Sequence, residues 1–233
     1  MKPTQLRANS SDMIRKLCAE AVGSTLLLSI VVGSGIMAER LSGGSAGLAL
    51  LGNAFATGAG LIVLILMFGP VSGAHFNPVV SLVESLQGKL AWSAAAGYAS
   101  VQVAGAVAGV WLAHAMFDEP IWQLSTKARD GSGQMISEAV ATFGLLGTIM
   151  CTSRFRPEVT PFAVGLYIAS AYWFTASTSF ANPAVTFARS MSDTFAGIAP
   201  ASAPAFIAAQ IAGSLAGYQF FKWLLLADRA NGQ

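Results

Sequence analysis

The sequence predicts an all-α polytopic membrane protein with six transmembrane helices and two shorter, re-entrant half-helices that enter the bilayer without crossing it. Three observations favour this fold class. The 233-residue chain is 54% hydrophobic and only 10% charged, whereas soluble domains average about 25% charged residues. Its apolar residues form long runs separated by short charged connections, which is typical of membrane spans. An Asn-Pro pair also opens a short helix-like piece in each half of the chain, at Asn77 and at Asn182.

Six apolar segments approach or exceed the roughly 20 residues that cross a bilayer. We expect spans at 16–38, 46–69, 91–116, 134–152, 159–177 and 203–226. The first span ends in Glu39-Arg40 without a small-residue cleavage site, so we interpret it as a retained helix and not as a signal peptide. A single membrane domain is therefore expected over 16–226, between a polar N-terminal tail, 1–15, and a C-terminal tail, 227–233.

An even number of spans places both termini on the same side of the membrane, and cytoplasmic connections carry an excess of Lys and Arg. With the termini inside, nine basic residues fall on the cytoplasmic side, namely Lys2, Arg7, Arg15, Lys16, Lys89, Arg154, Arg156, Lys222 and Arg229. Four fall outside, namely Arg40, Lys127, Arg129 and Arg189. This excess predicts that both tails are cytoplasmic.

The two halves of the chain repeat the same landmarks in the same order. Repeat one is expected over about 16–116 and repeat two over about 134–226. The matched landmarks are Glu20 with Glu138, Asn77 with Asn182, Gln102 with Gln210, and the glycine pair Gly105 and Gly109 with Gly213 and Gly217. Because each repeat holds three spans, an odd number, the second copy must be inverted relative to the first. Inverted repeats build sites near the bilayer midplane from broken helices, and glycines four residues apart let helices pack closely.

Each Asn-Pro pair has the chemistry of a helix start. Asparagine is a favoured N-cap, and proline at the first helical position loses no hydrogen bond because its missing N–H would have no partner there. Half-helices are expected at about 77–87, starting Asn77-Pro78-Val79, and at about 182–190, starting Asn182-Pro183-Ala184. Helix starts carry free N–H groups and the positive end of the helix dipole. Two starts that meet at membrane depth predict a pore constriction, not a catalytic site.

The two boxes also carry a family resemblance. Ser72-Gly73-Ala74-His75-Phe76-Asn77-Pro78 and Phe180-Ala181-Asn182-Pro183-Ala184-Val185 closely resemble the paired boxes of the major intrinsic proteins, the aquaporins and aquaglyceroporins, and the chain looks like a bacterial-type member. The resemblance implies six tilted helices around a pore and a homotetramer with one pore per subunit. It further implies a passive channel in the bacterial inner membrane, without enzymatic activity or cofactor, whose partners are lipid, water and small neutral solutes. The net charge of +2 gives no reason to expect nucleic acid.

Glu20 and Glu138 are ionisable residues inside apolar spans, where such groups are costly and usually functional or paired. Two roles compete for them. They could relay protons, as in a coupled transporter, or they could accept hydrogen bonds from the irregular backbone before each box, as the resemblance implies. Their equivalent positions in the two halves favour loop support, to which Gln102, Gln210 and His75 are expected to contribute. A pH gate near the cytoplasmic mouth is the alternative role for His75.

The resemblance places a selectivity filter on the outer side of the boxes. Its arginine, normally the third residue after the second Asn, is replaced here by Val185, and Thr57 stands where water-selective members carry a bulky aromatic residue. The fifth span contributes either Ser170 or Tyr172. Counting residues back from the second box gives Ser170, whereas counting forward from Gly165 gives Tyr172. Ser179, just before the second box, is also assigned to the filter.

Arg189 follows Val185 by one helical turn, about 6 Å further outward on the same face. We expect it to line the outer vestibule; the alternative is that it reaches back to the filter. Replacing arginine by valine removes five hydrogen-bond donors and a fixed charge, which leaves a wider and partly apolar filter. Such a filter favours glycerol- or urea-like solutes, or metalloid hydroxides such as arsenous acid, together with water, over water alone.

Other function classes have weaker support in the sequence. A water-selective aquaporin is the nearest alternative, and a proton-coupled secondary transporter would also use inverted repeats and intramembrane carboxylates. His75 and His114 are isolated from other ligand residues, so no metal site is expected, and no catalytic cluster predicts an enzyme. His114 is expected at the membrane interface, and Cys18 and Cys151 are expected to be buried free thiols.

Overall fold

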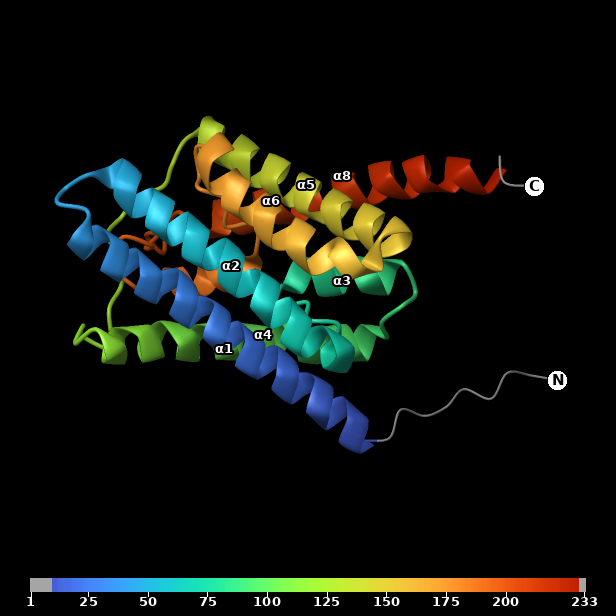
Figure 1. Cartoon of the computed structure of the whole chain (residues 1–233), viewed down its shortest axis with the longest axis horizontal. Coiled ribbons are helices and arrows are strands. Elements are labelled where there is room, and N and C mark those ends of the chain that lie inside the picture. The colour runs from blue at the N-terminus through green and yellow to red at the C-terminus, as the bar shows by residue number, and fades with distance from the viewer. Residues whose placement is uncertain (1–9, 231–233) are drawn as a thin grey trace.

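The chain forms a bundle of long helices that also contains two short ones, α3 and α7 (Figure 1). The computed structural model describes residues 10–230, and within these it has eight α-helices and one 3-10 helix. The elements are α1 (Ser10–Leu41), α2 (Ala46–Ser72), α3 (Pro78–Leu86), α4 (Trp92–Met116), α5 (Ser132–Phe155), η1 (Pro157–Val159), α6 (Thr160–Phe174), α7 (Pro183–Arg189) and α8 (Ala203–Ala230). Each half therefore holds three long helices, with the short helix between the second and third, as the repeat predicts.

Four helices in the described part of the chain, α1, α2, α4 and α5, are long and apolar enough to cross a membrane. α8 is also long, but polar residues such as Gln210 and Lys222 interrupt its apolar sequence. α6 has 15 residues, or about 22 Å of helix. The predicted span 159–177 is therefore α-helical only over Thr160–Phe174, and the following residues approach the second box as non-helical backbone.

The first helix is longer than the predicted span 16–38. α1 begins at Ser10 and continues to Leu41, so part of the predicted tail 1–15 is helical. An ion pair between Asp12 and Lys16, with an N–O distance of 2.7 Å, joins successive turns there. Lys2 and Arg7 of the predicted N-terminal tail, and 231–233 of the predicted C-terminal tail, lie outside the described residues.

Equivalent helices pack in the same way in the two halves. α1 packs along α4, and α5 packs along α8. A Cβ added at Gly105 of α4 would lie 2.3 Å from the carbonyl oxygen of Ala21, and one added at Gly213 of α8 would lie 2.2 Å from that of Ala139. Only glycine allows these backbones to approach so closely. The small residues that match between the repeats thus mark the contact inside each half, while α2 and α6 pack across the halves.

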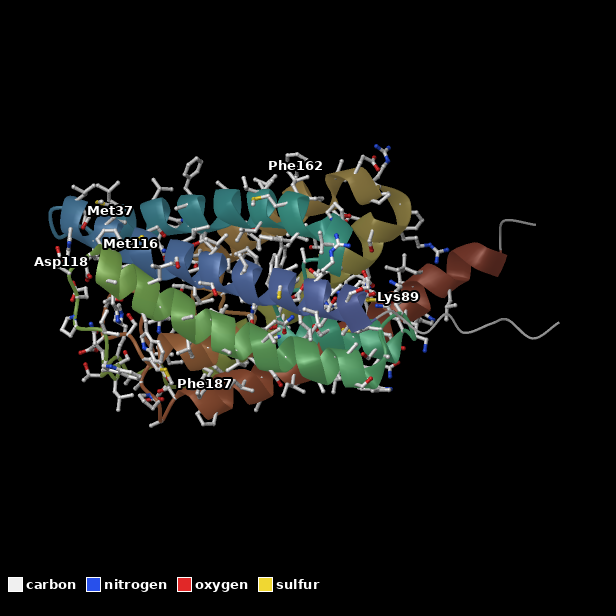
Figure 2. The ribbon with its side chains drawn as sticks, turned by 90° about the horizontal axis from the view of Figure 1, so that it is seen from below. Met37, Lys89, Met116, Asp118, Phe162 and Phe187 are labelled. Carbon is white, nitrogen blue, oxygen red and sulfur yellow. The ribbon has the colours of Figure 1, made fainter. Side chains whose placement is uncertain are left out.

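Large apolar side chains point outward around the bundle, as contact with lipid requires (Figure 2). Met37, Met116 and Phe162 are each between 46% and 56% exposed. The expectation of buried thiols is wrong for Cys18, which is exposed, while Cys151 is half-buried. The reason is geometric: Cys18 lies two positions before the fully buried Glu20, and two residues of a helix lie about 200° apart around its axis.

The two ends of the bundle carry different connections. α1 begins and α8 ends at the same end, on the right of Figure 1. The turn between α3 and α4, which carries Lys89, lies at that end, and the connection after α4, which carries Asp118, lies at the opposite end (Figure 2). Both ends of the helical bundle's chain thus lie on one side, as an even number of membrane crossings requires.

Candidate channel pore

Asn77 and Asn182 cap the two short helices. Both have extended backbone, with φ of −154° and −159°. The side-chain oxygen of Asn77 accepts a hydrogen bond from the N–H of Val79 at 3.1 Å. That of Asn182 accepts from the N–H groups of Ala184 at 3.0 Å and Val185 at 3.3 Å. With Pro78 and Pro183 at the first helical position, both boxes have the geometry that their sequences predict.

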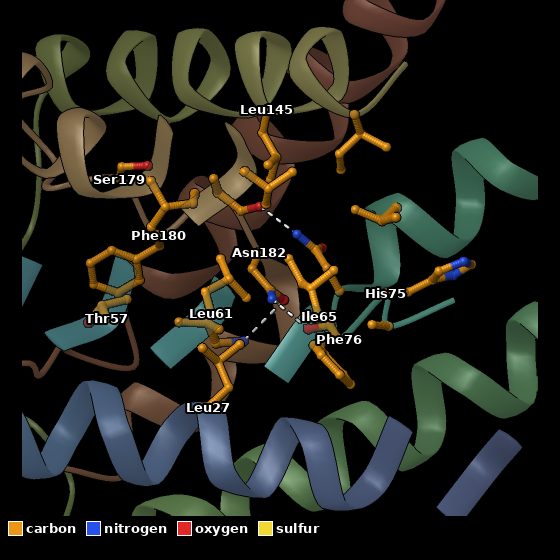
Figure 3. Close-up of a pocket in the computed structure, with 18 of the residues that line it drawn as sticks. Leu27, Thr57, Leu61, Ile65, His75, Phe76, Leu145, Ser179, Phe180 and Asn182 are labelled. Carbon is orange, nitrogen blue, oxygen red and sulfur yellow. Dashed lines mark hydrogen bonds between the residues drawn. The ribbon is translucent and has the colours of Figure 1, made fainter. Parts of the chain in front are cut away.

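Each capping asparagine also binds the opposite box. The side-chain nitrogen of Asn77 donates to the carbonyl of Ala181 at 2.8 Å, and that of Asn182 donates to the carbonyl of Phe76 at 2.7 Å (Figure 3). A side-chain amide has two N–H donors. Each asparagine therefore uses one of them to join the two half-helices and keeps the other for the cavity that both residues line.

The segments before the boxes adopt strained backbone at equivalent positions. Ala74 and Phe76 have φ of 51° and 47°, and Ser179 and Ala181 have φ of 50° and 48°. Non-glycine residues seldom occupy this left-handed region, and they persist there when the surroundings hold them in place. Each of the two strained segments therefore needs contacts that hold its backbone in place.

Glu20 supports the first segment from α1. Its carboxylate accepts hydrogen bonds from the backbone N–H of His75 at 2.9 Å and of Phe76 at 2.7 Å, and from the hydroxyl of Ser72 at 2.6 Å. The amide of Gln102 donates to the same carboxylate at 2.8 Å. Glu20 is fully buried, so these donors replace the water that an ionised carboxylate needs.

Glu138 supports the second segment from α5 in the same way. It accepts from the backbone N–H groups of Phe180 and Ala181, both at 2.9 Å, and from the amide of Gln210 at 2.6 Å. Glu138 is also fully buried. Both carboxylates are thus occupied by loop and amide donors, which favours loop support over a proton relay.

The two histidines have different environments. One ring nitrogen of His75 lies 3.0 Å from the hydroxyl of Ser81, and the residue lines the cavity. His114 lies near the end of the third predicted span and was expected at the membrane interface. It is fully buried, with its ring nitrogens 3.1 Å from the carbonyl of Ile121 and 2.9 Å from the hydroxyl of Ser192. Ile121 follows His114 closely in the chain, but Ser192 lies 78 residues away, and the span pattern does not reveal that contact.

A cavity of about 290 Å³ runs through the bundle past both asparagines. Glu84 and Lys89 line one end, and Thr57 and Arg189 line the other. Figure 3 shows the same order, with His75 on one side of Asn182, and Thr57 and Ser179 on the other. Side chains between the ends are mostly apolar, including Leu27, Leu61, Ile65, Leu145, Val164 and Ile168. Polar contacts are therefore concentrated at the centre and the two ends.

The end of the cavity lined by Thr57 and Arg189, called the outer end below, contains most of the residues that the sequence assigned to a filter. Thr57, Tyr172, Ser179 and Val185 all line it, and each is at most 6% exposed. The hydroxyl of Tyr172 donates to that of Thr57 at 3.3 Å. The alternative, Ser170, is exposed and its hydroxyl donates to the carbonyl of Tyr167 in its own helix. Of the two candidates for the filter position in α6, Tyr172 therefore lies at the cavity and Ser170 does not.

Arg189, which was expected to line the outer vestibule, is enclosed within the protein. It is 2% exposed and lines the same end of the cavity as Val185. Its guanidinium carbon lies 3.4 Å from the centroid of the Phe180 ring, and its Nε donates to the carbonyl of Ala196. The loop 190–202 folds over the residue, which explains its burial.

Sequence reasoning missed a second arginine next to the pore. Arg129, in the connection after α4, lies 4.9 Å from the Phe180 ring centroid. It donates to the carbonyls of Gly197 at 2.9 Å and Ser177 at 3.2 Å. Nothing in the polar segment around Arg129 marks it as different from a solvated charge, since its partners are backbone atoms more than 40 residues away.

Charged groups in the outer connections have shifted pKa values. Burial and the neighbouring Arg129 lower the pKa of Lys127, whose amino group donates to the carbonyl of Phe195 at 2.9 Å. The backbone N–H of Thr126, 2.7 Å from Asp193, lowers the pKa of that carboxyl group. The connection after α4 and the loop after α7 are therefore joined by polar contacts, although they are far apart in sequence.

Within residues 10–230, no three His, Cys, Asp or Glu side chains lie close enough together to hold a metal ion.

A bundle of membrane-spanning helices, in which two capped half-helices meet at an internal cavity, has the architecture of a membrane channel. The model of the family described as "Major intrinsic protein" matches residues 7–172, and the chain belongs to this family. It is therefore a channel protein and not an enzyme. The second box lies beyond the matched segment.

Individual relatives agree with this assignment. Over 218 residues the chain is 53% identical to "Aquaglyceroporin AqpS" of Rhizobium meliloti (strain 1021), covering 94% of this chain and 93% of that protein. It is 28% identical to the "Glycerol uptake facilitator protein" of Streptococcus pneumoniae (strain ATCC BAA-255 / R6), covering 67% and 73%. The fold also matches the X-ray structure of the aquaglyceroporin from Plasmodium falciparum, with a TM-score of 0.69 and 20% identity over 90% of this chain and 95% of that one.

Proposed function

We propose that this protein is a passive channel for small uncharged solutes of the glycerol and urea type, or for metalloid hydroxides such as arsenous acid, and that water also passes. The observation that carries the solute class is Val185, which lines the outer cavity where the family resemblance leads one to expect an arginine. The resemblance to proteins named aquaglyceroporin and glycerol uptake facilitator supports the same class.

The outer end of the cavity suits a solute larger and less polar than water. Val185 presents an apolar wall, and the hydroxyl of Tyr172 donates its hydrogen bond to that of Thr57. The remaining central donors belong to Asn77 and Asn182. A hydroxylated solute can place its carbon face against Val185 while its hydroxyl groups exchange hydrogen bonds with these amides.

Ion exclusion is expected to come in part from the half-helices. The N-termini of α3 and α7 meet at the centre of the cavity, where their positive dipole ends oppose the entry of cations and protons, as in aquaporin-type pores generally. This barrier does not depend on the residue at position 185.

Permeability of reconstituted vesicles tests the solute class. Stopped-flow measurements would compare osmotic water flux with uptake of glycerol, urea and arsenous acid. We expect fast, non-saturating flux of at least one of these solutes together with water. Water flux alone would support a water-selective aquaporin, and saturating flux driven by a pH gradient would support a coupled transporter.

Assembly and topology are further parts of the proposal. We propose one channel domain over 16–226 with both termini cytoplasmic, in a homotetramer in the bacterial inner membrane, with no cofactor and no nucleic-acid partner. Large apolar residues are exposed on both α2 and α6, for example Phe55 at 74% and Leu166 at 65%, which suits contact with lipid or with other subunits. Cysteine labelling from each side of the membrane and mass measurement in detergent would test these points.

A further inference from the structure

Arg189 is a buried arginine without a carboxylate partner. It is 2% exposed, and none of the three ion pairs in the described residues includes it. A guanidinium group remains protonated in proteins, and a buried unpaired charge is strongly unfavourable. A charge kept at such a cost within a membrane channel indicates a functional role.

The position of the Arg189 side chain is fixed by contacts along one edge. Its Nε donates to the carbonyl of Ala196, and its guanidinium plane lies against the ring of Phe180. The residue also ends α7, where the helix dipole favours a positive charge. These contacts hold the group in place and leave its other edge free.

Two buried polar atoms at this end of the cavity have no hydrogen-bond partner in the protein. They are Nη1 of Arg189 and Oγ of Ser179. Both residues line the cavity, and Ser179 lies beside Phe180 in Figure 3. Buried polar atoms are almost always hydrogen-bonded, so two free ones on the wall of a solute pathway indicate a passing ligand.

We infer that Arg189 and Ser179 form a binding subsite for an oxygen atom of the permeating solute, and that Arg189 supplies the fixed positive charge that Val185 lacks. The inference rests on the proposed function. The guanidinium acts from the next helical turn, about 6 Å beyond position 185. Hydroxylated solutes exchange a hydrogen bond with water for one from Nη1, while cations meet an unpaired charge.

Relocating the arginine provides the decisive test. Three variants of the full chain, Arg189→Met, Arg189→Lys and the exchange variant V185R/R189V, would be reconstituted beside the parent protein. Potassium leak and the ratio of glycerol to water permeability would be measured in each. Arg40→Gln is the control, since Arg40 is an exposed outer arginine that pairs with Glu119 and does not line the cavity.

Removing the donor in Arg189→Met should lower the glycerol-to-water ratio about tenfold, which corresponds to the loss of roughly one hydrogen bond to a charged group. Removing the unpaired positive charge, which repels cations, should raise potassium leak about tenfold. Arg189→Lys and the exchange variant should retain low leak, while the control should match the parent. A purely structural arginine would not be rescued from position 185. Parent-like leak and ratio in a folded Arg189→Met protein would overturn the inference. Absence of glycerol, urea and arsenous acid flux in the parent itself would instead overturn the proposed function.

Discussion

The side-chain nitrogen of Asn77 lies 2.8 Å from the carbonyl oxygen of Ala181, the residue directly before the second capping asparagine. The reciprocal contact from Asn182 to Phe76 closes the pair. One amide group in each box therefore caps its own half-helix, joins the other half of the protein and still lines the cavity. The stability of the fold and the geometry of the pore depend on the same two side chains.

Asn77→Ala should lower both stability and permeability. The variant loses a helix cap and the bond across the boxes, which together contribute about 2 kcal/mol. Thermal unfolding in detergent and water flux in vesicles would measure the two effects. Asn53→Ala is the matched control, because Asn53 is equally buried and donates to Val31 and Ser34 but does not line the cavity. It should lose stability and keep its flux per folded molecule; equal loss of flux in both variants would contradict the prediction.

Glu138→Gln should destabilise the second box without changing the driving force of transport. The new amide nitrogen would face the amide of Gln210 or a backbone N–H, since every partner of this carboxylate is a donor. Losing charge-assisted hydrogen bonds costs about 2–3 kcal/mol. The expected result is a lower unfolding temperature and reduced glycerol flux, both independent of any pH gradient. Glu20→Gln should behave similarly, and loss of a pH-driven component in either variant would indicate a proton relay.

Val185→Arg should reduce glycerol permeability more than water permeability. The longer side chain narrows the outer cavity and adds a second guanidinium close to Arg189. A pocket that loses the space of a few methylene groups discriminates by roughly 10- to 100-fold, so glycerol flux should fall at least tenfold while water flux changes less. Val185→Leu adds bulk without charge and separates the two contributions. Unchanged or greater glycerol flux in Val185→Arg would show that the narrowest point lies elsewhere.

The sequence predicted the parts of this structure that are repeated. Both asparagine caps, both carboxylates and both glutamines occur at matched positions, and the structure gives them matched contacts. The glycines at 105 and 213 marked close helix contacts for the same reason. Because each feature occurs once in each half of the chain, the sequence contains two examples of it. Local sequence patterns were therefore sufficient to predict these features.

Features that occur once depended on tertiary contacts that the sequence does not show. Tyr172 lines the cavity and Ser170 does not, which depends on how α6 is rotated against its neighbours. Arg129 approaches Phe180 only because the connection after α4 folds against the second box. The burial of Arg189 depends on the carbonyl of Ala196 in the following loop. These relationships join segments without regular periodicity, so spacing alone could not reveal them.

The close contact between α5 and α8 makes a further prediction about stability. Gly213→Ala places a methyl group 2.2 Å from the backbone carbonyl oxygen of Ala139, which cannot rotate away as a side chain would. The helices must separate, and such overpacking costs about 2 kcal/mol. Gly133→Ala, at the exposed start of α5, has no atom within 4 Å of the new carbon and should stay within about 0.5 kcal/mol of the parent. Thermal unfolding of both variants in detergent would measure the difference. Since Gln210 and Glu138 join the same helix pair, the clash at Gly213 should also lower glycerol flux; equal stability of the two variants would show that the helix pair can separate without loss.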